Sequence, residues 1–240
     1  MKNYALVTGA SGEIGQAIAR EMAAQGYNLY LHYFRNKHAV EKLQIEFSSI
    51  IECKLIKANL AVQEGPRMLA EQIKTPIDVF IYNCGSSHTG LITDVSEKEL
   101  DGMVQLQLKS PFQLIQQLLP SMIERKKGSI VMITSIWGQT GASCEVLYSM
   151  VKGGMNTMVK ALSKELAPSG IRVNAVAPGI ISTKMNEHLS EKELEEISEE
   201  IPLGRFGLPE EVSDAVGYLV SKKSSYVTGH ILPVNGAWYC

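Results

Sequence analysis

The chain has 240 residues, which is enough for one α/β domain with a full hydrophobic core. Hydrophobic residues make up 45% of it and the formal net charge is -2, so it lacks the clustered basic surface typical of nucleic-acid binding. No apolar run approaches the ~20 residues of a membrane span, and the first residues enter a strand pattern without a leader. We therefore expect a cytoplasmic protein without nucleic-acid or membrane partners, and a single domain over residues 1–240.

Short apolar runs rich in strand-forming residues alternate along the chain with longer helical patterns. The predicted strands are Tyr4–Thr8, Asn28–Tyr33, Glu52–Lys57, Val79–Tyr82, Ser129–Thr134, Arg172–Ala177 and His230–Pro233. The predicted helical segments begin near Ile14, Lys37, Gln63, Glu97, Tyr148 and Pro209. Because buried parallel strands read as continuous apolar runs joined by helices, this alternation predicts an α/β fold: a single Rossmann-type, doubly wound parallel sheet with helices on both faces.

One segment near the end differs in composition from the rest of the chain. Residues Asn186–Glu200 are acidic and helical in pattern, and they lie between the last two predicted strands. An insertion at this point suits a substrate lid, which we place at about residues 183–205. A solvated surface helix explains the same pattern, so the sequence leaves both interpretations open.

A glycine-rich turn, TGASGEIG, joins the first predicted strand to the first helix. Glycines at such a turn let the backbone approach a pyrophosphate, and the N–H groups and dipole of the following helix favour its negative charge. The turn resembles the TGxxxGxG signature of the short-chain dehydrogenase/reductase family. The family's middle glycine falls on Glu13, whose side chain must then point away from the phosphates. The resemblance implies cofactor contacts by Gly9, Ser11, Gly12, Ile14 and Gly15.

The second predicted strand ends in LHYFRN, where NAD-binding proteins commonly carry an acidic residue for the ribose hydroxyls. No acid is present in that stretch, and the guanidinium of Arg35 can pair with the 2′-phosphate of NADP. We therefore expect NADP(H) as the cofactor. The family resemblance implies further cofactor contacts by Asn59, Leu60, Asn83, Gly85, Tyr148, Lys152, Pro178, Gly179, Ile181 and Thr183.

Three side chains with the spacing Ser-x12-Tyr-x3-Lys predict the chemistry. Tyr148 and Lys152 lie four residues apart on a predicted helix and so face the same way, and Ser135 ends the preceding strand. Reduction of a ketone by hydride needs an acid for the developing alkoxide. A tyrosine can serve, because a neighbouring ammonium lowers the pKa of its phenol. The hydroxyl of Ser135 can donate a hydrogen bond to the carbonyl oxygen as charge builds there.

From Thr8 to Gly236 the chain resembles short-chain dehydrogenase/reductases, most of all the 3-oxoacyl-acyl-carrier-protein reductase branch. The stretches that carry the resemblance are ITS, YSMVKGG, ALSKELAPSGIRVNAVAPG and PLGRFGLPEEV. It implies that Tyr148 is the acid, Lys152 its electrostatic partner and Ser135 the carbonyl donor. Gln107 stands where the family has an asparagine that supports a proton-relay water, and glutamine offers the same amide on a longer arm.

Two features bear on the substrate. Acyl carriers are acidic, and Arg125–Lys127 offers a basic cluster beside the predicted active-site mouth, although basic residues also suit a helix end. Between Ser135 and Tyr148, the stretch IWGQTGASCEV carries Trp137 and Glu145. It resembles a subgroup of bacterial reductases that reduce an aminopentanone on elongation factor P. A carboxylate there suits an amine-bearing ketone, and an ordinary surface glutamate explains the same residue.

Other expectations follow from the departures and from the resemblance. Glu13 and Gln107 keep open a function of another class, a catalytically silent NADP-binding sensor or scaffold. The five histidines and four cysteines show no ligand spacing, so we expect no metal site. The resemblance implies a homotetramer. In it, helical segments Glu97–Glu124 and Tyr148–Ala167 pair across a two-fold axis, and the tail Asn235–Cys240 joins a second interface.

Overall fold

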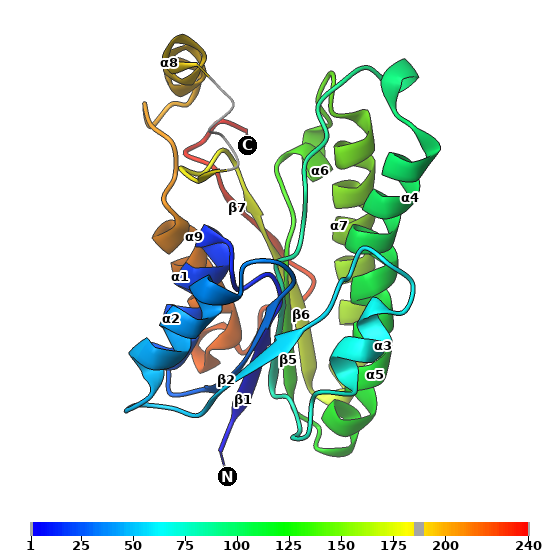
Figure 1. Ribbon diagram of the computed structural model, residues 1–240, viewed down its shortest axis with the longest axis vertical. Helices are drawn as coiled ribbons and strands as arrows, with labels where there is room; N and C mark the ends of the chain where they lie inside the picture. The colour runs from blue at the N-terminus through cyan, green and yellow to red at the C-terminus, as the bar shows by residue number, and fades with distance from the viewer. Residues whose placement is uncertain (1, 185–189, 240) are drawn as a thin grey trace.

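The strands of the chain run parallel in one sheet, as the computed structural model shows for residues 2–184 and 190–239 (Figure 1). The sheet has seven strands in the order β3-β2-β1-β4-β5-β6-β7 within these described residues. They are β1 (Tyr4–Val7), β2 (Asn28–Tyr33), β3 (Cys53–Lys57), β4 (Val79–Tyr82), β5 (Gly128–Ile133), β6 (Ile171–Pro178) and β7 (Ile231–Val234). The predicted Rossmann-type sheet is confirmed.

Helices cover both faces of this sheet (Figure 1). One face carries α1 (Glu13–Ala24), α2 (Lys37–Phe47) and α9 (Pro209–Val220), and the other carries α3 (Gly65–Ala70), α4 (Glu97–Val104), α5 (Ser110–Glu124) and α7 (Val146–Leu166). Two further helices, α6 (Trp137–Thr140) and α8 (Glu191–Glu200), lie toward the end of the molecule where the strands finish. Among the described helices, none is both long and apolar enough to cross a membrane.

The sheet separates two hydrophobic cores because successive strand side chains point to opposite faces. On β1, Leu6 packs in the core under α5 and α7, whereas Val7 packs in the core under α1, α2 and α9. Every residue of β1, β2 and β4 is buried, which explains why these strands read as continuous apolar runs. The two cores hold the carboxyl ends of the strands in a fixed row.

Neighbouring strands β1 and β4 mark the point where the strand order reverses. Their connections leave toward opposite faces, with α1 on one side and the α4–α5 layer on the other (Figure 1). In open parallel sheets, ligands bind in the crevice outside the carboxyl ends of the strands at such a point.

Several predicted boundaries need correction. The third helix begins at Gly65 rather than near Gln63, and the predicted helical segment Glu97–Glu124 is interrupted by a π turn at Gln105–Lys109. The four-residue helix α6 was not predicted. Within the predicted lid, Glu191–Glu200 is helical, and its N-cap Ser190 accepts a hydrogen bond from the backbone of Glu193. Residues 185–189 of that lid, and Cys240 of the tail, lie outside the described residues.

Candidate active site

Most of the residues predicted to bind the cofactor follow the carboxyl ends of successive strands. The glycine loop follows β1, Arg35 follows β2, and Asn59 and Leu60 follow β3. Asn83 and Gly85 follow β4, Ser135 follows β5, and the segment Gly179–Thr183 follows β6, which ends at Pro178. Since the strands are parallel and adjacent, the fold brings these residues to one edge of the sheet (Figure 1).

The glycine loop is shaped by two positions that tolerate no side chain. Gly9 adopts a φ of +65°, in the left-handed region that favours glycine. A Cβ at Gly15 would lie 2.2 Å from the carbonyl oxygen of Gly9, so the loop and the first turn of α1 pack backbone to backbone. The first N–H groups of a helix have no partner within the helix, so those at the start of α1 are available to an anion.

His32, on β2, holds the glycine loop in position through hydrogen bonds. Its Nδ1 accepts the N–H of Gly9 at 3.1 Å, and its Nε2 lies 3.1 Å from the carbonyl oxygen of Ala58, to which it can donate. Burial lowers the pKa of His32 to about 4, so the ring is neutral and both bonds are compatible with one tautomer. Sequence reasoning missed this role, although a lone histidine in the apolar strand NLYLHY was the available signal.

Glu13, the departure from the glycine signature, does point away from the loop. Its carboxylate accepts the backbone N–H of Lys184 at 2.7 Å. The next residue back, Thr183, bonds through its hydroxyl to the carbonyl of Ile181 at 3.3 Å. Glu13 therefore ties the first turn of α1 to the segment that leads from β6 toward the lid.

Arg35 lies exposed at the end of β2, with its guanidinium 5.3 Å from the ring centroid of Phe34. Among the described residues, no carboxylate forms an ion pair with it. On the neighbouring strand end, Asn59 accepts the N–H of Ala61 at 3.0 Å, and Leu60 is buried. This side of the crevice offers a cation without an acidic competitor.

Ser135, Tyr148 and Lys152 converge beyond the end of β5. Ser135 is 7% exposed and bonds the hydroxyl of Tyr148, which lies in the first turn of α7. Lys152 follows one helical turn later and is 4% exposed. Its Nζ lies 5.4 Å from the centroid of the Tyr148 ring and donates to the carbonyl oxygen of Ile133 at 3.0 Å. The predicted triad is thus assembled on one strand end and one helix.

The pKa of Tyr148 differs from the expectation, based on the sequence, that the ammonium of Lys152 lowers it. Burial raises the pKa of Tyr148 to about 12, the bond to Ser135 opposes this, and the carboxylate of Glu145 adds to it. Burial also lowers the pKa of Lys152 to about 7. Desolvation disfavours both charged forms, so in the protein alone Tyr148 is a neutral phenol and Lys152 is poised between charge states.

The side chain of Gln107 lies beside Gly85, close to Lys152. Its Nε2 donates to the carbonyl oxygen of Ser86 at 2.9 Å, and its Oε1 is buried without a hydrogen-bond partner among the described residues. A Cβ placed on Gly85 would lie 3.3 Å from Gln107 Oε1 and 3.4 Å from Lys152 Nζ. Both polar atoms therefore lie close to Gly85, where a side chain would be crowded.

Two loops meet beside Tyr148. The carbonyl oxygen of Cys144 accepts the N–H of Gly90 at 2.8 Å, and the hydroxyl of Thr89 donates to the carboxylate of Glu145 at 3.4 Å. Glu145 immediately precedes α7, and its charge reaches Tyr148 strongly enough to raise the pKa of the phenol. A carboxylate is therefore close to the group that would protonate a carbonyl oxygen.

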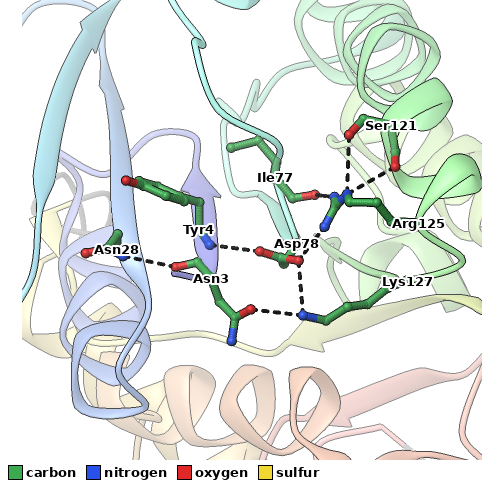
Figure 2. Close-up of polar contacts among 8 residues, drawn as sticks. All are labelled: Asn3, Tyr4, Asn28, Ile77, Asp78, Ser121, Arg125 and Lys127. Atoms are coloured by element: carbon green, nitrogen blue, oxygen red, sulfur yellow. Dashed lines mark hydrogen bonds and ion pairs between the residues drawn. The ribbon is translucent and has the colours of Figure 1, made fainter. Parts of the chain in front are cut away.

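The basic cluster Arg125–Lys127 lies at the opposite edge of the sheet, so the expectation that it borders the active-site mouth is wrong. Arg125 and Lys127 lie 2.6 Å and 3.2 Å from a carboxylate oxygen of Asp78, the residue before β4 (Figure 2). Burial acts to raise the pKa of Asp78. The N–H of Tyr4 and these two cations nevertheless hold that pKa below its usual value. The two cations stabilise the beginning of β4.

No three histidine, cysteine or acidic side chains gather closely enough to hold a metal ion in the part of the chain that the structure describes. The site therefore consists of hydroxyls, an amide, a buried ammonium and a glycine loop.

Comparison with known proteins gives full-length matches. The family model described as enoyl-(acyl carrier protein) reductase matches residues 9–238. The chain is 51% identical to the uncharacterized oxidoreductase YmfI of Bacillus subtilis, over 100% of both proteins. It is 35% identical to the 3-oxoacyl-[acyl-carrier-protein] reductase FabG of Staphylococcus epidermidis, again over 100% of both.

A solved structure is also close. It is the crystal structure of a protein from Beutenbergia cavernae assigned as an NAD(P)-dependent gluconate 5-dehydrogenase, with NADP bound at low occupancy. It superposes with a TM-score of 0.92 at 29% identity, covering 98% of this chain and 96% of that one.

Proposed function

Because this chain belongs to the short-chain dehydrogenase/reductase family, we propose that it is an NADPH-dependent ketone reductase similar to 3-oxoacyl-acyl-carrier-protein reductases. It is an oxidoreductase that uses NADP. The observation that carries the proposal is the meeting of Ser135, Tyr148 and Lys152 at the carboxyl edge, next to the glycine loop. The full-length similarity to reductases of acyl-carrier-bound ketones supports the choice of substrate class.

The residues of the cofactor crevice fit NADP. The first turn of α1 supplies N–H groups for the pyrophosphate, and exposed Arg35 supplies a cation for the 2′-phosphate without an acid to repel it. Gly9, Ser11, Gly12, Ile14 and Gly15 form the loop. Contacts from the other strand ends come from Asn59, Leu60, Asn83, Gly85, Pro178, Gly179, Ile181 and Thr183. When bound there, a reduced nicotinamide supplies the hydride that reaches the carbonyl carbon.

Tyr148 is the acid in this proposal. Its pKa of about 12 keeps the phenol protonated near neutral pH, so it can donate its proton to the carbonyl oxygen as that oxygen gains charge. The hydroxyl of Ser135, already bonded to Tyr148, aligns the carbonyl by donating to the same oxygen. The C=O π bond breaks, C–H and O–H bonds form, and a phenolate remains on Tyr148.

Lys152 then restores the phenol. With a pKa of about 7, its ammonium readily gives up a proton, and its positive form stabilises the phenolate. We propose that a water bound by Lys152 Nζ and by Gln107 Oε1, which has no hydrogen-bond partner among the described residues, resupplies Lys152. Gln107 thereby takes the part of the family's asparagine.

A second substrate is favoured by the charge around the mouth. The basic cluster Arg125–Lys127 lies at the far edge, while Glu145 lies beside Tyr148 and helix α8 is acidic. A carboxylate at the mouth attracts an ammonium group. An aminopentanone carried on elongation factor P fits this pattern better than an acidic acyl carrier does.

The first experiment compares NADPH oxidation with an acetoacetyl thioester and with elongation factor P that carries the aminopentanone. We expect turnover of at least one of them. Preference for the thioester supports the carrier proposal, and preference for the modified factor supports the second one. Steady NADPH oxidation with either ketone, or with a generic β-ketoester, excludes the alternative of a silent NADP-binding sensor or scaffold. If none of the three is reduced, the proposed substrate class is wrong.

The second experiment tests the acid. Tyr148→Phe keeps the ring but removes the proton donor, and general acid catalysis typically contributes 10²–10⁴-fold, so turnover should fall by roughly that factor. NADPH affinity, measured by the fluorescence of the dihydronicotinamide, should persist. Turnover within about threefold of the wild type would refute the role of Tyr148.

A further inference from the structure

The C-terminal tail, residues Asn235–Tyr239, is folded into a defined turn after β7. The side chain of Asn235 accepts the N–H of Ala237 at 3.0 Å and donates to the carbonyl oxygen of Tyr239 at 2.6 Å. The N–H of Trp238 bonds the carbonyl oxygen of Asn235 at 3.0 Å. Ala237 has a φ of +66°, in the left-handed region that residues with a Cβ rarely adopt. The hydrogen bonds hold a strained turn and so fix the position of Trp238.

This turn lies against two parts of the candidate active site. A Cβ on Gly179 would lie 3.0 Å from Asn235, so the tail touches the segment after β6 to which the family resemblance assigns cofactor contacts. The carbonyl oxygen of Gly236 accepts the N–H of Leu203 at 3.3 Å, from the chain that follows α8. The tail is thus packed between the cofactor segment and the base of the predicted lid.

Trp238 meets Trp137 across this edge. Their ring centroids lie 5.2 Å apart with the planes at 64°, an edge-to-face pair. Both side chains are only partly buried and belong to neither of the two cores of the described chain. The backbone N–H of Trp137 donates to the hydroxyl oxygen of Ser135 at 3.2 Å. Trp137 therefore directly contacts Ser135, the proposed hydrogen-bond donor to the carbonyl oxygen.

Alternative roles for the pair are weaker. An aromatic pair that only filled space would lie inside one of the cores, and a tail that only ended the chain would not need a strained residue held by three hydrogen bonds. Strain of this kind is retained where the surrounding structure fixes a functional geometry. Large, partly exposed aromatic surfaces beside a reactive centre are typical of ligand recognition.

We propose that Trp137 and Trp238 form the wall of the ketone pocket, and that Trp238 is a specificity-determining residue that packs against the alkyl chain beside the carbonyl. This inference rests on the proposed ketone reductase function. It assigns the tail to the substrate site of its own subunit. The substrate class that it selects is a ketone with an unbranched methylene chain, which presents apolar surface to the two rings.

The test uses ethyl esters of 3-oxobutanoate, 3-oxohexanoate and 3-oxooctanoate as probes. Covering each added methylene with apolar surface should raise kcat/KM about fourfold in the wild type. Trp238→Ala should flatten this dependence on chain length, so that kcat/KM falls most for the longest ester and least for the shortest. Trp238→Phe, which restores an aromatic ring, should recover most of the slope. Tyr239→Ala is the matched control on the same turn and should leave the slope unchanged.

A second readout does not depend on turnover. Trp137 and Trp238 are the two tryptophans of the chain, so its indole emission reports on this pair alone. Titration of the NADP-saturated protein with the longest ester should change that emission in the wild type, and in Trp137→Phe and Trp238→Phe as single-tryptophan proteins.

The two failures can be told apart. If the wild type reduces the esters and Trp238→Ala shows the same chain-length dependence, the wall proposal is wrong and the reductase proposal stands. If neither the esters nor the two ketones of the first experiment are reduced, the reductase proposal fails. An unchanged indole emission with every ester then overturns the wall proposal as well.

Discussion

At the scale of single residues, Lys152 shows how burial sets chemistry. The ammonium is almost fully enclosed, and the loss of water lowers its pKa to about 7, whereas an exposed lysine stays charged far above that pH. The same burial raises the pKa of Tyr148 to about 12. Lys152 therefore changes charge within the physiological pH range, whereas Tyr148 stays protonated throughout it.

This separation predicts the pH dependence of the reaction. Measured as kcat/KM for NADPH, which reports ionisations of the cofactor-free protein, activity should be high at low pH and fall as pH rises through about 7. The positive charge of Lys152 is lost in that direction, while Tyr148 stays protonated up to about pH 12. Lys152→Met should be weakly active and should lack the inflection. If kcat/KM of Lys152→Met still falls as pH rises through about 7, the ionisation belongs to another group.

The preference for NADPH over NADH can be tested at Arg35. Arg35→Ala should weaken NADPH by roughly 10–100-fold and NADH little, because only NADPH has the 2′-phosphate that the guanidinium can pair with. Fluorescence titration with both cofactors provides the measurement. Lys37→Ala is a matched control, since Lys37 is a neighbouring cation already paired with Glu41 at 2.8 Å. Equal weakening of both cofactors would show that Arg35 has a structural role.

At the scale of elements, the π turn between α4 and α5 decides where Gln107 points. The N–H of Ser110 bonds the carbonyl oxygen of Gln105, five residues back, and Pro111 has no N–H to continue the ordinary ladder. The carbonyl oxygen of Leu106 accepts the hydroxyl of Tyr82 instead. A bulge of this kind is frequent at functional sites, and here the buried amide of Gln107 lies beside Gly85.

We predict that Gln107→Asn keeps or raises turnover, because asparagine offers the same amide one methylene closer to the backbone. Gln107→Leu should lower kcat roughly tenfold, the effect of losing about one hydrogen bond in the relay. The thermal midpoint of both variants serves as the control for folding. If Gln107→Leu is folded and turns over as fast as the wild type, Gln107 is no part of the relay.

At the scale of the whole molecule, the helical layer on one face leaves large apolar side chains exposed. Phe112 on α5 and Met150 on α7 are 49% and 50% exposed. Leu100 and Ile123 on the α4–α5 segment are exposed too. Exposed apolar surface on adjacent long helices is typical of a subunit interface, and it lies on the segments that the family resemblance assigns to one.

We therefore predict a homotetramer with two kinds of two-fold contact, measured by light scattering at micromolar concentration. Phe112→Glu combined with Met150→Glu places charges on the exposed helical face and should reduce the assembly to a smaller species that remains folded. Tyr226→Glu is the control, because Tyr226 is fully exposed and belongs to the connection between α9 and β7 rather than to these helices. A wild-type monomer would exclude the tetramer.

The sequence by itself determined the sheet, the order of most elements and the residues gathered at its edge. The spacing of apolar residues along a strand shows whether it is buried on both faces. The glycine loop follows β1 directly, and Ser135, Tyr148 and Lys152 follow β5 within a short stretch of chain. These features are local in the chain. Neighbouring residues therefore specify them without knowledge of distant contacts.

Only the tertiary structure decided the environments. Burial by distant elements reversed the expected direction of the pKa of Tyr148, and Arg125 and Lys127 pair with Asp78, 47 or more residues away in sequence. The roles of His32 and of the Trp137–Trp238 pair depend on partners 23 or more residues away in sequence. Charge state and contact arise from what surrounds a side chain in space, and that is set by packing between segments that the local sequence pattern does not bring together.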